Sequence, residues 1–248
     1  MSCREKQLAD ALEALRQRLD DAAATAGRQR GDVELLPVTK FFPATDVAIL
    51  SRLGCRAFGE SREQEAAAKI REVAALVDEP PATALHWHMV GRIQRNKARP
   101  VARWADAAHS VDSERLAAAL DRAAITALAA GERAEPLRVY VQISLDGDES
   151  RGGVDIGRPD DVDRICAQVD AAEGLTLVGL MGVPPLGSDA ESFYRRLQTE
   201  HQRVRDTHPQ ATGLSAGMSA DLEAAVKHGS TCVRVGTALL GPRPLTSP

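Results

Sequence analysis

The sequence predicts an α/β protein built as a single (β/α)8 TIM-type barrel, with residues 1–248 forming one domain. Three observations lead to this prediction. Short apolar segments alternate with amphipathic segments along the chain, a pattern typical of parallel strands joined by helices. The length of 248 residues suits one barrel of this class. No linker, low-complexity segment or long repeat divides the chain.

Eight short apolar segments are the expected strands of the barrel. They cover residues 33–40, 55–61, 86–91, 106–112, 137–144, 175–182, 213–217 and 232–237. An open, doubly wound sheet is the alternative, but it needs a glycine-rich first turn to bind a nucleotide. The first turn here, TKFFPATD at 39–46, contains no glycine, so the closed barrel is favoured.

The helices are expected in the amphipathic segments between these strands. Their first residues are expected near side chains that cap helix N-termini, namely Asp46, Ser61 or Ser113, and Ser219. Their last turns are expected before glycines that adopt a left-handed conformation, namely Gly54, Gly131, Gly174 and Gly229. The eighth strand is followed by GPRPLTSP at 241–248, which cannot form a helix. A helix at 4–26 precedes the first strand, and we expect it to fill the place of the missing last helix.

Composition and charge exclude several classes of protein. The net charge of −4 gives no reason to expect nucleic acid or an anionic membrane as a partner. No run of about 18 apolar residues is available to span a membrane, and the N-terminus has no signal-peptide pattern. The four cysteines form no CxxC motif and are expected to be reduced. We expect a cytoplasmic protein, and a monomer.

Residues at the carboxyl ends of the strands are the candidate site residues, because the chemistry of barrels is located there. Lys40 places an amine at the end of the first strand. Ser219, Gly236 and Thr237 follow the seventh and eighth strands and are suited to bind a phosphate. An amine beside a phosphate site suits a phosphorylated aldehyde held as a Schiff base, and burial would lower the pKa of the lysine as this chemistry requires. The alternative roles are a solvated surface lysine for Lys40, a helix cap for Ser219 and a simple turn for Gly236.

One further candidate residue, Arg234, is expected inside the barrel. Arg234 shares a strand face with Gly236 and not with Val233 and Val235, so it is expected to point inwards. An interior arginine needs a partner, and a phosphate, a ring nitrogen or a carboxylate such as Glu60 would serve.

His86 and His88 alternate along the third strand. This spacing is compatible with a metal site, but the sequence shows no evident third ligand. Packing or lining of the site is therefore the favoured role of these two side chains.

Seven sequence blocks together resemble the pyridoxal-phosphate homeostasis protein family, whose members are single barrels similar to the N-terminal domain of alanine racemase. The blocks are TK (39–40), FGESREQEA (58–66), WHMVGRIQRNK (87–97), HSVDS (109–113), GLMGVPP (179–185), LSAGMSADLEAAVKHGST (214–231) and VRVGTALLGPR (233–243). They occur in order and cover most of the chain. The family's second block commonly reads FGEN, so Ser61 replaces an asparagine here, and Arg151 stands where the family often has lysine.

The resemblance implies pyridoxal 5′-phosphate as cofactor, with Lys40 as the Schiff-base lysine. It implies that Ser219, Gly236 and Thr237 hold the phosphate and that Arg234 faces the pyridine nitrogen. It also places His88 and Met218 near the cofactor ring.

The function implied by the resemblance is intracellular buffering of the cofactor and its delivery to apo forms of enzymes that use it. The alternatives are an amino-acid racemase and a Schiff-base aldolase that acts on a phosphosugar without a cofactor. A cationic Arg234 disfavours protonation of the ring nitrogen, which fits holding or racemisation better than other chemistry. Racemisation needs a second base. Tyr140 is expected in the middle of a strand and Tyr194 on an outer helix, so neither should reach the mouth of the barrel. In alanine racemases a tyrosine of a second domain serves this purpose, and we expect no such domain within residues 1–248. We therefore expect little turnover.

Overall fold

The structure is a computed structural model that describes residues 2–77, 84–148, 151–185 and 187–243. The strands are β1 (Glu34–Pro37), β2 (Ala57–Glu60), β3 (His86–Met89), β4 (Ala107–Val111), β5 (Leu137–Ser144), β6 (Val154–Asp155), β7 (Leu175–Gly182), β8 (Gly213–Ser215) and β9 (Cys232–Val235). The helices are α1 (Cys3–Thr25), α2 (Ala44–Arg52), α3 (Glu63–Leu76), α4 (Ala98–Trp104), α5 (Glu114–Ala129), α6 (Pro159–Asp170), α7 (Ala190–Thr207), α8 (Leu222–Lys227) and α9 (Thr237–Leu240).

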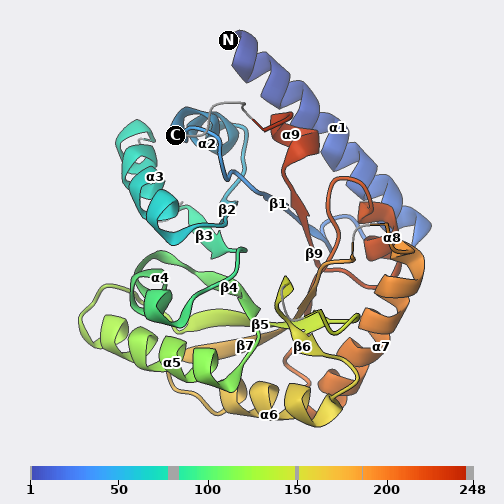
Figure 1. Ribbon diagram of the computed structural model, residues 1–248. Coiled ribbons are helices and arrows are strands. Elements are labelled where there is room, and N and C mark those ends of the chain that lie inside the picture. The colour runs from blue at the N-terminus through green and yellow to red at the C-terminus, as the bar shows by residue number, and fades with distance from the viewer. Residues whose placement is uncertain (1, 78–83, 149–150, 186, 244–248) are drawn as a thin grey trace.

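The predicted parallel barrel is confirmed. Its strands follow one another around the ring in the order β1-β9-β8-β7-β5-β4-β3-β2, and the short β6 pairs with β5 beside this path. The ring closes between β1 and β2 at a single bridge, Val38 to Gly59, where the Thr39 amide donates to the Gly59 carbonyl at 2.9 Å. Helices surround the strands (Figure 1). All eight predicted strands are present at shorter or equal length, and β6 is an addition.

Pro37 is explained by this closure. Along β1 the amides of Glu34 and Val38 donate towards β9, whereas the Thr39 amide donates towards β2. The alternation of a strand directs the position of the missing Pro37 N–H towards β2 as well. Because β1 meets β2 only at the one bridge, a proline at this position removes no bond from the β1–β9 ladder.

The helix α1 covers the barrel where the first and last strands meet. Its buried residues recur at helical spacing, Leu8, Leu12, Leu15 and Leu19, and it packs on α8 and α9 (Figure 1). The expectation that an N-terminal helix fills this place is therefore confirmed. The eighth barrel strand is nevertheless followed by one short helix, α9, which sequence reasoning missed, and residues 244–248 lie outside the described part of the chain.

Several predicted helix boundaries need correction. Ser113 caps α5, and its hydroxyl accepts from the Leu116 amide. Asp46 instead lies within the first turn of α2, buried, and forms an ion pair with Arg4 at 2.5 Å. Neither Ser61 nor Ser219 is a helix cap, because α3 begins after Arg62 and α8 after Asp221.

The predicted left-handed glycines are mostly confirmed. Gly54, Gly131 and Gly229 have positive φ angles of 89°, 67° and 86°. Gly174 does not, and it is required for a different reason: a Cβ there would lie 2.7 Å from the Asp121 carbonyl oxygen. Within the described ranges, no helix is long and apolar enough to cross a membrane.

Candidate functional site

Lys40 lies in a tight turn directly after β1, at the carboxyl end of the barrel. The turn runs from Thr39 to Phe42, whose amide donates to the Thr39 carbonyl at 3.1 Å. Lys40 is exposed, so the expectation of a buried amine is wrong. The strand ends at Pro37, and the three residues that follow carry the amine out of the apolar surroundings that a longer strand would have given it. What the turn provides instead is an amine open to solvent at the mouth of the barrel.

The second component of the site is formed by the loops after β8 and β9, which are neighbouring strands. The Ser219 hydroxyl accepts from the Ala238 amide at 3.2 Å and so joins the two loops. Within the described part of the chain, no protein acceptor is present for the backbone amides of Ser219, Ala220, Gly236 and Thr237. These residues are half-buried or exposed, so a ligand can reach the four N–H groups. We refer to them as the amide cradle.

The amide cradle is adjacent to the turn of Lys40. β1 pairs with β9 in a register that places Pro37 beside Val235, and the Val38 amide donates to the Val235 carbonyl at 2.9 Å. A Cβ at Gly236 would come within 3.4 Å of the Val38 carbonyl oxygen. Lys40 and Gly236 therefore leave neighbouring strands at the same edge of the barrel, and not from opposite sides of its mouth.

Four contacts shape the loop that contributes Met218 and Ser219. Gly217 has a φ of +93°, and a Cβ there would lie 2.6 Å from the Ala225 Cβ, so only glycine fits. Asp221 accepts from the Met218 amide at 2.6 Å and from the Tyr194 hydroxyl at 2.8 Å. The Ser219 carbonyl accepts from Arg18 of α1 at 2.7 Å. The loop is thus held from beneath by α7 and from outside by α1, while the amides of Ser219 and Ala220 have no acceptor among the described residues.

Arg234 points into the barrel, as predicted, and is only 6% exposed. Its guanidinium donates to the Ser215 hydroxyl and, at 2.9 Å, to the Gly182 carbonyl. The alternative of an ion pair with Glu60 is wrong, since Glu60 bonds with Thr39 and Lys69. Among the described residues no carboxylate forms an ion pair with Arg234, and its burial lowers the pKa of the guanidinium below its usual value.

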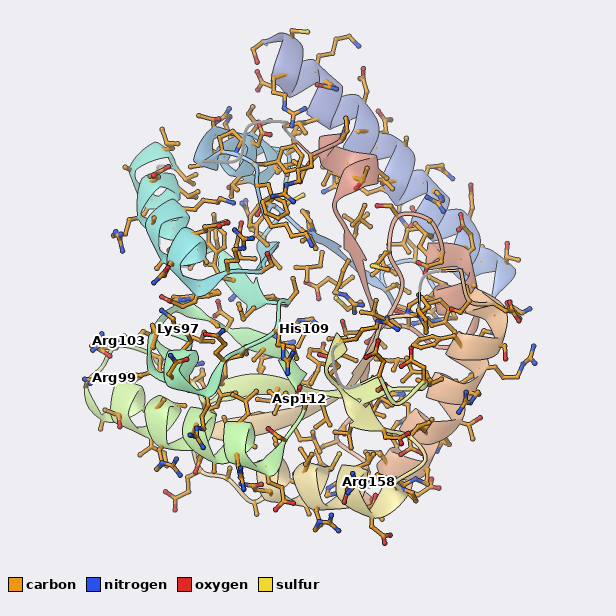
Figure 2. All side chains as sticks on the ribbon, in the orientation of Figure 1. Lys97, Arg99, Arg103, His109, Asp112 and Arg158 are labelled. Carbon is orange, nitrogen blue, oxygen red and sulfur yellow. The ribbon has the colours of Figure 1, made fainter. Side chains whose placement is uncertain are left out.

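A line of polar side chains continues from Arg234 across the barrel interior. The His109 Nδ1 lies 2.8 Å from the Ser215 hydroxyl, and the His109 Nε2 lies 3.0 Å from the His88 Nδ1. His109 extends from β4 into the centre of the barrel (Figure 2) and stacks on the Tyr140 ring at 4.4 Å. Burial lowers the pKa of His88 to about 4 and lowers that of His109 well below its usual value, so both rings are neutral near pH 7.

A metal role for the histidines of β3 has no support in the structure. His86 is exposed at the start of β3 and lies 3.2 Å from Asp106, whereas His88, two residues further along the strand, is buried. In the ranges that the structure describes, no group of three or more His, Cys, Asp or Glu side chains could hold a metal ion.

Two interior residues were not recognised as candidates from the sequence, although both lie in quoted motifs. His109 belongs to a strand whose five residues are all buried, and Ser215 belongs to a buried three-residue strand. A polar residue within such a short apolar strand signals a buried partner, because an unpaired polar group costs free energy there. Tyr194 was expected on an outer helix, which is confirmed, but its hydroxyl reaches inwards to Asp221.

The fold and the site together define a class of protein: a parallel (β/α)8 barrel with a lysine and an amide cradle at the ends of neighbouring strands. The chain matches the family described as alanine racemase, N-terminal domain, over residues 11–244. The solved alanine racemase of Corynebacterium glutamicum shares the fold, with a TM-score of 0.66 and 16% identity over 97% of this chain and 62% of that one.

More similar proteins are found in a narrower group. The pyridoxal phosphate homeostasis protein of Mycobacterium tuberculosis (strain ATCC 25618 / H37Rv) is 66% identical over 248 residues, covering 99% of this chain and 96% of that protein. PipY of Synechococcus elongatus PCC7942, solved with pyridoxal phosphate bound, is 34% identical with a TM-score of 0.77, covering 94% of this chain and all of that one. The chain belongs to the pyridoxal phosphate homeostasis protein family.

Proposed function

We propose that this protein binds pyridoxal 5′-phosphate as a Schiff base on Lys40 and maintains the supply of this cofactor, without catalytic turnover of its own. In this proposal it acts as a monomer and gives its cargo to apo forms of enzymes that use the cofactor. The single observation that carries the proposal is the amide cradle beside the turn of Lys40.

The amide cradle fits the phosphate group of the cofactor. Backbone N–H groups at the end of a barrel are suited to bind a phosphate, and the loops after the last two barrel strands are a common place for one. The Ser219 hydroxyl joins the two loops, and the exposed Thr237 hydroxyl adds a further donor. Met218 lies in the same loop as Ser219, half-buried, where it can contact the cofactor ring.

Lys40 supplies the amine that condenses with the cofactor aldehyde and releases one water. Its exposure makes this bond accessible to water and to free amines, which would remove the cofactor by exchange. A carrier benefits from such exchange, whereas an enzyme normally excludes water from its reacting centre. The open position of Lys40 therefore supports release of the cargo.

Arg234 is the residue that argues against general catalysis. It is a buried cation inside the barrel, and we propose that it is directed to the pyridine nitrogen, which it would keep unprotonated. The bound cofactor can act as an electron sink, and an unprotonated ring is a weaker one. His88 and His109, both neutral, support Arg234 through Ser215.

The proposal is tested by fixing the cofactor with borohydride and mapping the modified peptide. We expect an absorbance band of the Schiff base that disappears on reduction, with the pyridoxyl group on the peptide that contains Lys40. Lys97 and Lys227 serve as internal controls. Lys97 follows β3 and Lys227 ends α8, so neither lies at the carboxyl end of β1 or β9. Labelling of either one in place of Lys40 would overturn the assignment.

The phosphate part of the proposal has its own test, a comparison of pyridoxal with its phosphate ester. The phosphate ester should bind much more tightly than pyridoxal. If the Thr237 hydroxyl donates to the charged phosphate, Thr237→Ala should reduce the difference in binding free energy between the two compounds by about 1.5–3 kcal/mol. Equal affinities for the two compounds would show that the amide cradle binds no anion.

A further inference from the structure

A buried ion pair lies directly behind the turn of Lys40. Lys69 of α3 is 9% exposed, and Glu60 at the end of β2 is fully buried. The Lys69 ammonium donates to the Glu60 Oε1 at 2.6 Å and to the Thr39 carbonyl at 2.7 Å. The Thr39 hydroxyl donates to the same Glu60 oxygen at 2.7 Å. The pair therefore forms hydrogen bonds with both the carbonyl and the side chain of Thr39, the residue before Lys40.

The turn that the pair contacts has an unfavourable backbone conformation. The Thr39 carbonyl accepts the Phe42 amide and so closes a four-residue turn with Lys40 and Phe41 at its centre. Phe41 has a φ of +70°, and it is the one residue other than glycine with a positive φ among the described residues. The third residue of such a turn is normally glycine or asparagine, because a side chain is strained there. Strain of this kind persists only where surrounding contacts impose it.

Stability alone gives no reason for this ion pair. The second oxygen of Glu60 is buried and has no hydrogen-bond partner among the described residues, which is a cost. Replacing a buried ion pair by apolar side chains is often neutral or stabilising. The ion pair is better explained by its contact with the Thr39 carbonyl, because this carbonyl closes the strained turn.

We propose that Lys69 and Glu60 are positioning residues that impose the strained turn and thereby direct the amine of Lys40 towards the amide cradle. Lys69 draws the Thr39 carbonyl towards α3, which keeps the peptide of Lys40 in the orientation that the closed turn requires. Without this contact Phe41 would relax to a negative φ, and the Lys40 side chain would no longer be directed towards the cradle. The inference rests on the proposed role of Lys40 in binding the cofactor.

The test uses the double variant Glu60→Leu/Lys69→Met, which removes both charges and leaves neither one unpaired. We expect capture of the cofactor aldehyde by Lys40 to slow by roughly tenfold to a hundredfold, as for a misplaced reacting group. In the protein without cofactor, we expect faster hydrogen exchange of the Phe42 amide, which donates to Thr39. Non-covalent affinity for the cofactor, measured with Lys40→Ala added, should be unchanged.

Two further variants separate positioning from folding. Arg203→Met breaks an ion pair in α7 with the buried Glu200, far from the turn, and should leave the capture rate unchanged. Phe41→Gly, added to the double variant, should restore part of the capture rate because glycine adopts a positive φ without strain. If the double variant does not fold, Lys69→Gln is measured in the same way.

Capture at the wild-type rate in the double variant, with unchanged exchange at Phe42, would overturn the inference. Failure of the proposed function looks different. In that case the wild-type protein forms no adduct at Lys40, while exchange of the Phe42 amide still reports on whether the ion pair holds the turn.

Discussion

The buried side chains between β3 and β9 are joined in one line of hydrogen bonds, from His88 through His109 and Ser215 to Arg234. Arg234 is the charged member of the line, and the histidines are neutral because burial disfavours their protonated forms. A neutral partner beside Arg234 can orient the guanidinium without forming an ion pair with it. Among the described residues, no carboxylate therefore neutralises the charge of Arg234.

Arg234→Glu reverses the charge that we place beside the pyridine nitrogen. A carboxylate there favours a protonated ring, so the absorbance spectrum of the bound cofactor should shift and the affinity should fall. Arg234→Gln, which removes the charge without reversing it, is the comparison. The measurement is an absorbance titration of each variant with the cofactor, and an unchanged spectrum and affinity in Arg234→Glu would show that Arg234 does not face the ring.

The depressed pKa of His88 predicts a loss of stability in acid. The folded-state pKa of about 4 lies below the usual 6.5, so between these values the unfolded chain binds a proton that the folded chain does not. The free energy of unfolding should therefore fall as the pH drops from 6.5 to about 4, and the difference between the two pKa values corresponds to about 3 kcal/mol.

Urea unfolding at pH 7 and at successively lower pH measures this effect. His88→Asn should flatten the decline relative to the wild-type protein, although it lowers stability at pH 7. His86→Asn, at an exposed histidine on the same strand, is the control and should leave the decline as it is. Parallel pH curves for the wild type and His88→Asn would contradict the prediction.

At the scale of single elements, α1 connects parts of the chain that are far apart in sequence. Arg18 forms an ion pair with Glu223 at 2.5 Å and donates to the Ser219 carbonyl in the amide cradle. Arg4 reaches Asp46 of α2 and the Leu240 carbonyl at the end of α9. The helix thus supports the loop that contributes Met218 and Ser219, as well as covering the barrel.

Leu12→Ala should lower the free energy of unfolding by about 2–5 kcal/mol, because Leu12 is 2% exposed between α1 and the barrel. Leu76→Ala is the matched control, since Leu76 is 48% exposed at the end of α3 and should change stability by no more than about 0.5 kcal/mol. Both values come from urea unfolding. Similar losses in the two variants would mean that α1 does not contribute its buried face to the folded core.

The barrel itself could be predicted from the sequence because alternating apolar and amphipathic segments follow from the periodicity of strands and helices. The short elements α9 and β6 could not be predicted in this way. α9 has four residues between two glycines, and β6 has two, so neither is long enough to show a periodic pattern. Asp46 was misplaced as a cap because the same residue type serves as a cap or, as here, as the partner of Arg4.

The candidate site was predicted in part for a similar reason. Lys40 and the loops at 217–219 and 236–237 could be found because they follow apolar strands and carry motifs, and Arg234 because it is a charged residue within an apolar strand. The exposure of Lys40 depends on where β1 ends, which is the least certain feature of a strand pattern. The buried pair of Lys69 with Glu60 depends on the tilt of α3 against β2, and lysine in a helix normally indicates a solvated face.

At the scale of the whole molecule, the described residues offer no second acid–base group suited to racemisation. Tyr140 is buried beneath His109, and the Tyr194 hydroxyl is bonded to Asp221. His88 is buried, neutral and bonded to His109. Two-base chemistry needs a group on each face of the substrate carbon, and Lys40 can supply only one.

We therefore predict little or no conversion of L-alanine to D-alanine with saturating cofactor. A coupled assay at micromolar protein should give a turnover far below the enzyme median of about 10 per second. Lys40→Ala is the control for any residual signal. A turnover near the median that is lost in Lys40→Ala would favour the racemase over the carrier.

The meeting of the first and last barrel strands under α1 has a consequence for biosynthesis. β1 lies beside β9, and the apolar stripe of α1 is covered by α8 and α9, so the earliest elements to leave the ribosome pair with the latest. At typical rates of translation, β1 waits roughly 10 to 40 s for its partner strand. During this interval the leucines of α1 can pack only on early elements such as α2, and the part of their surface that α8 and α9 cover stays exposed on the nascent chain until synthesis is complete.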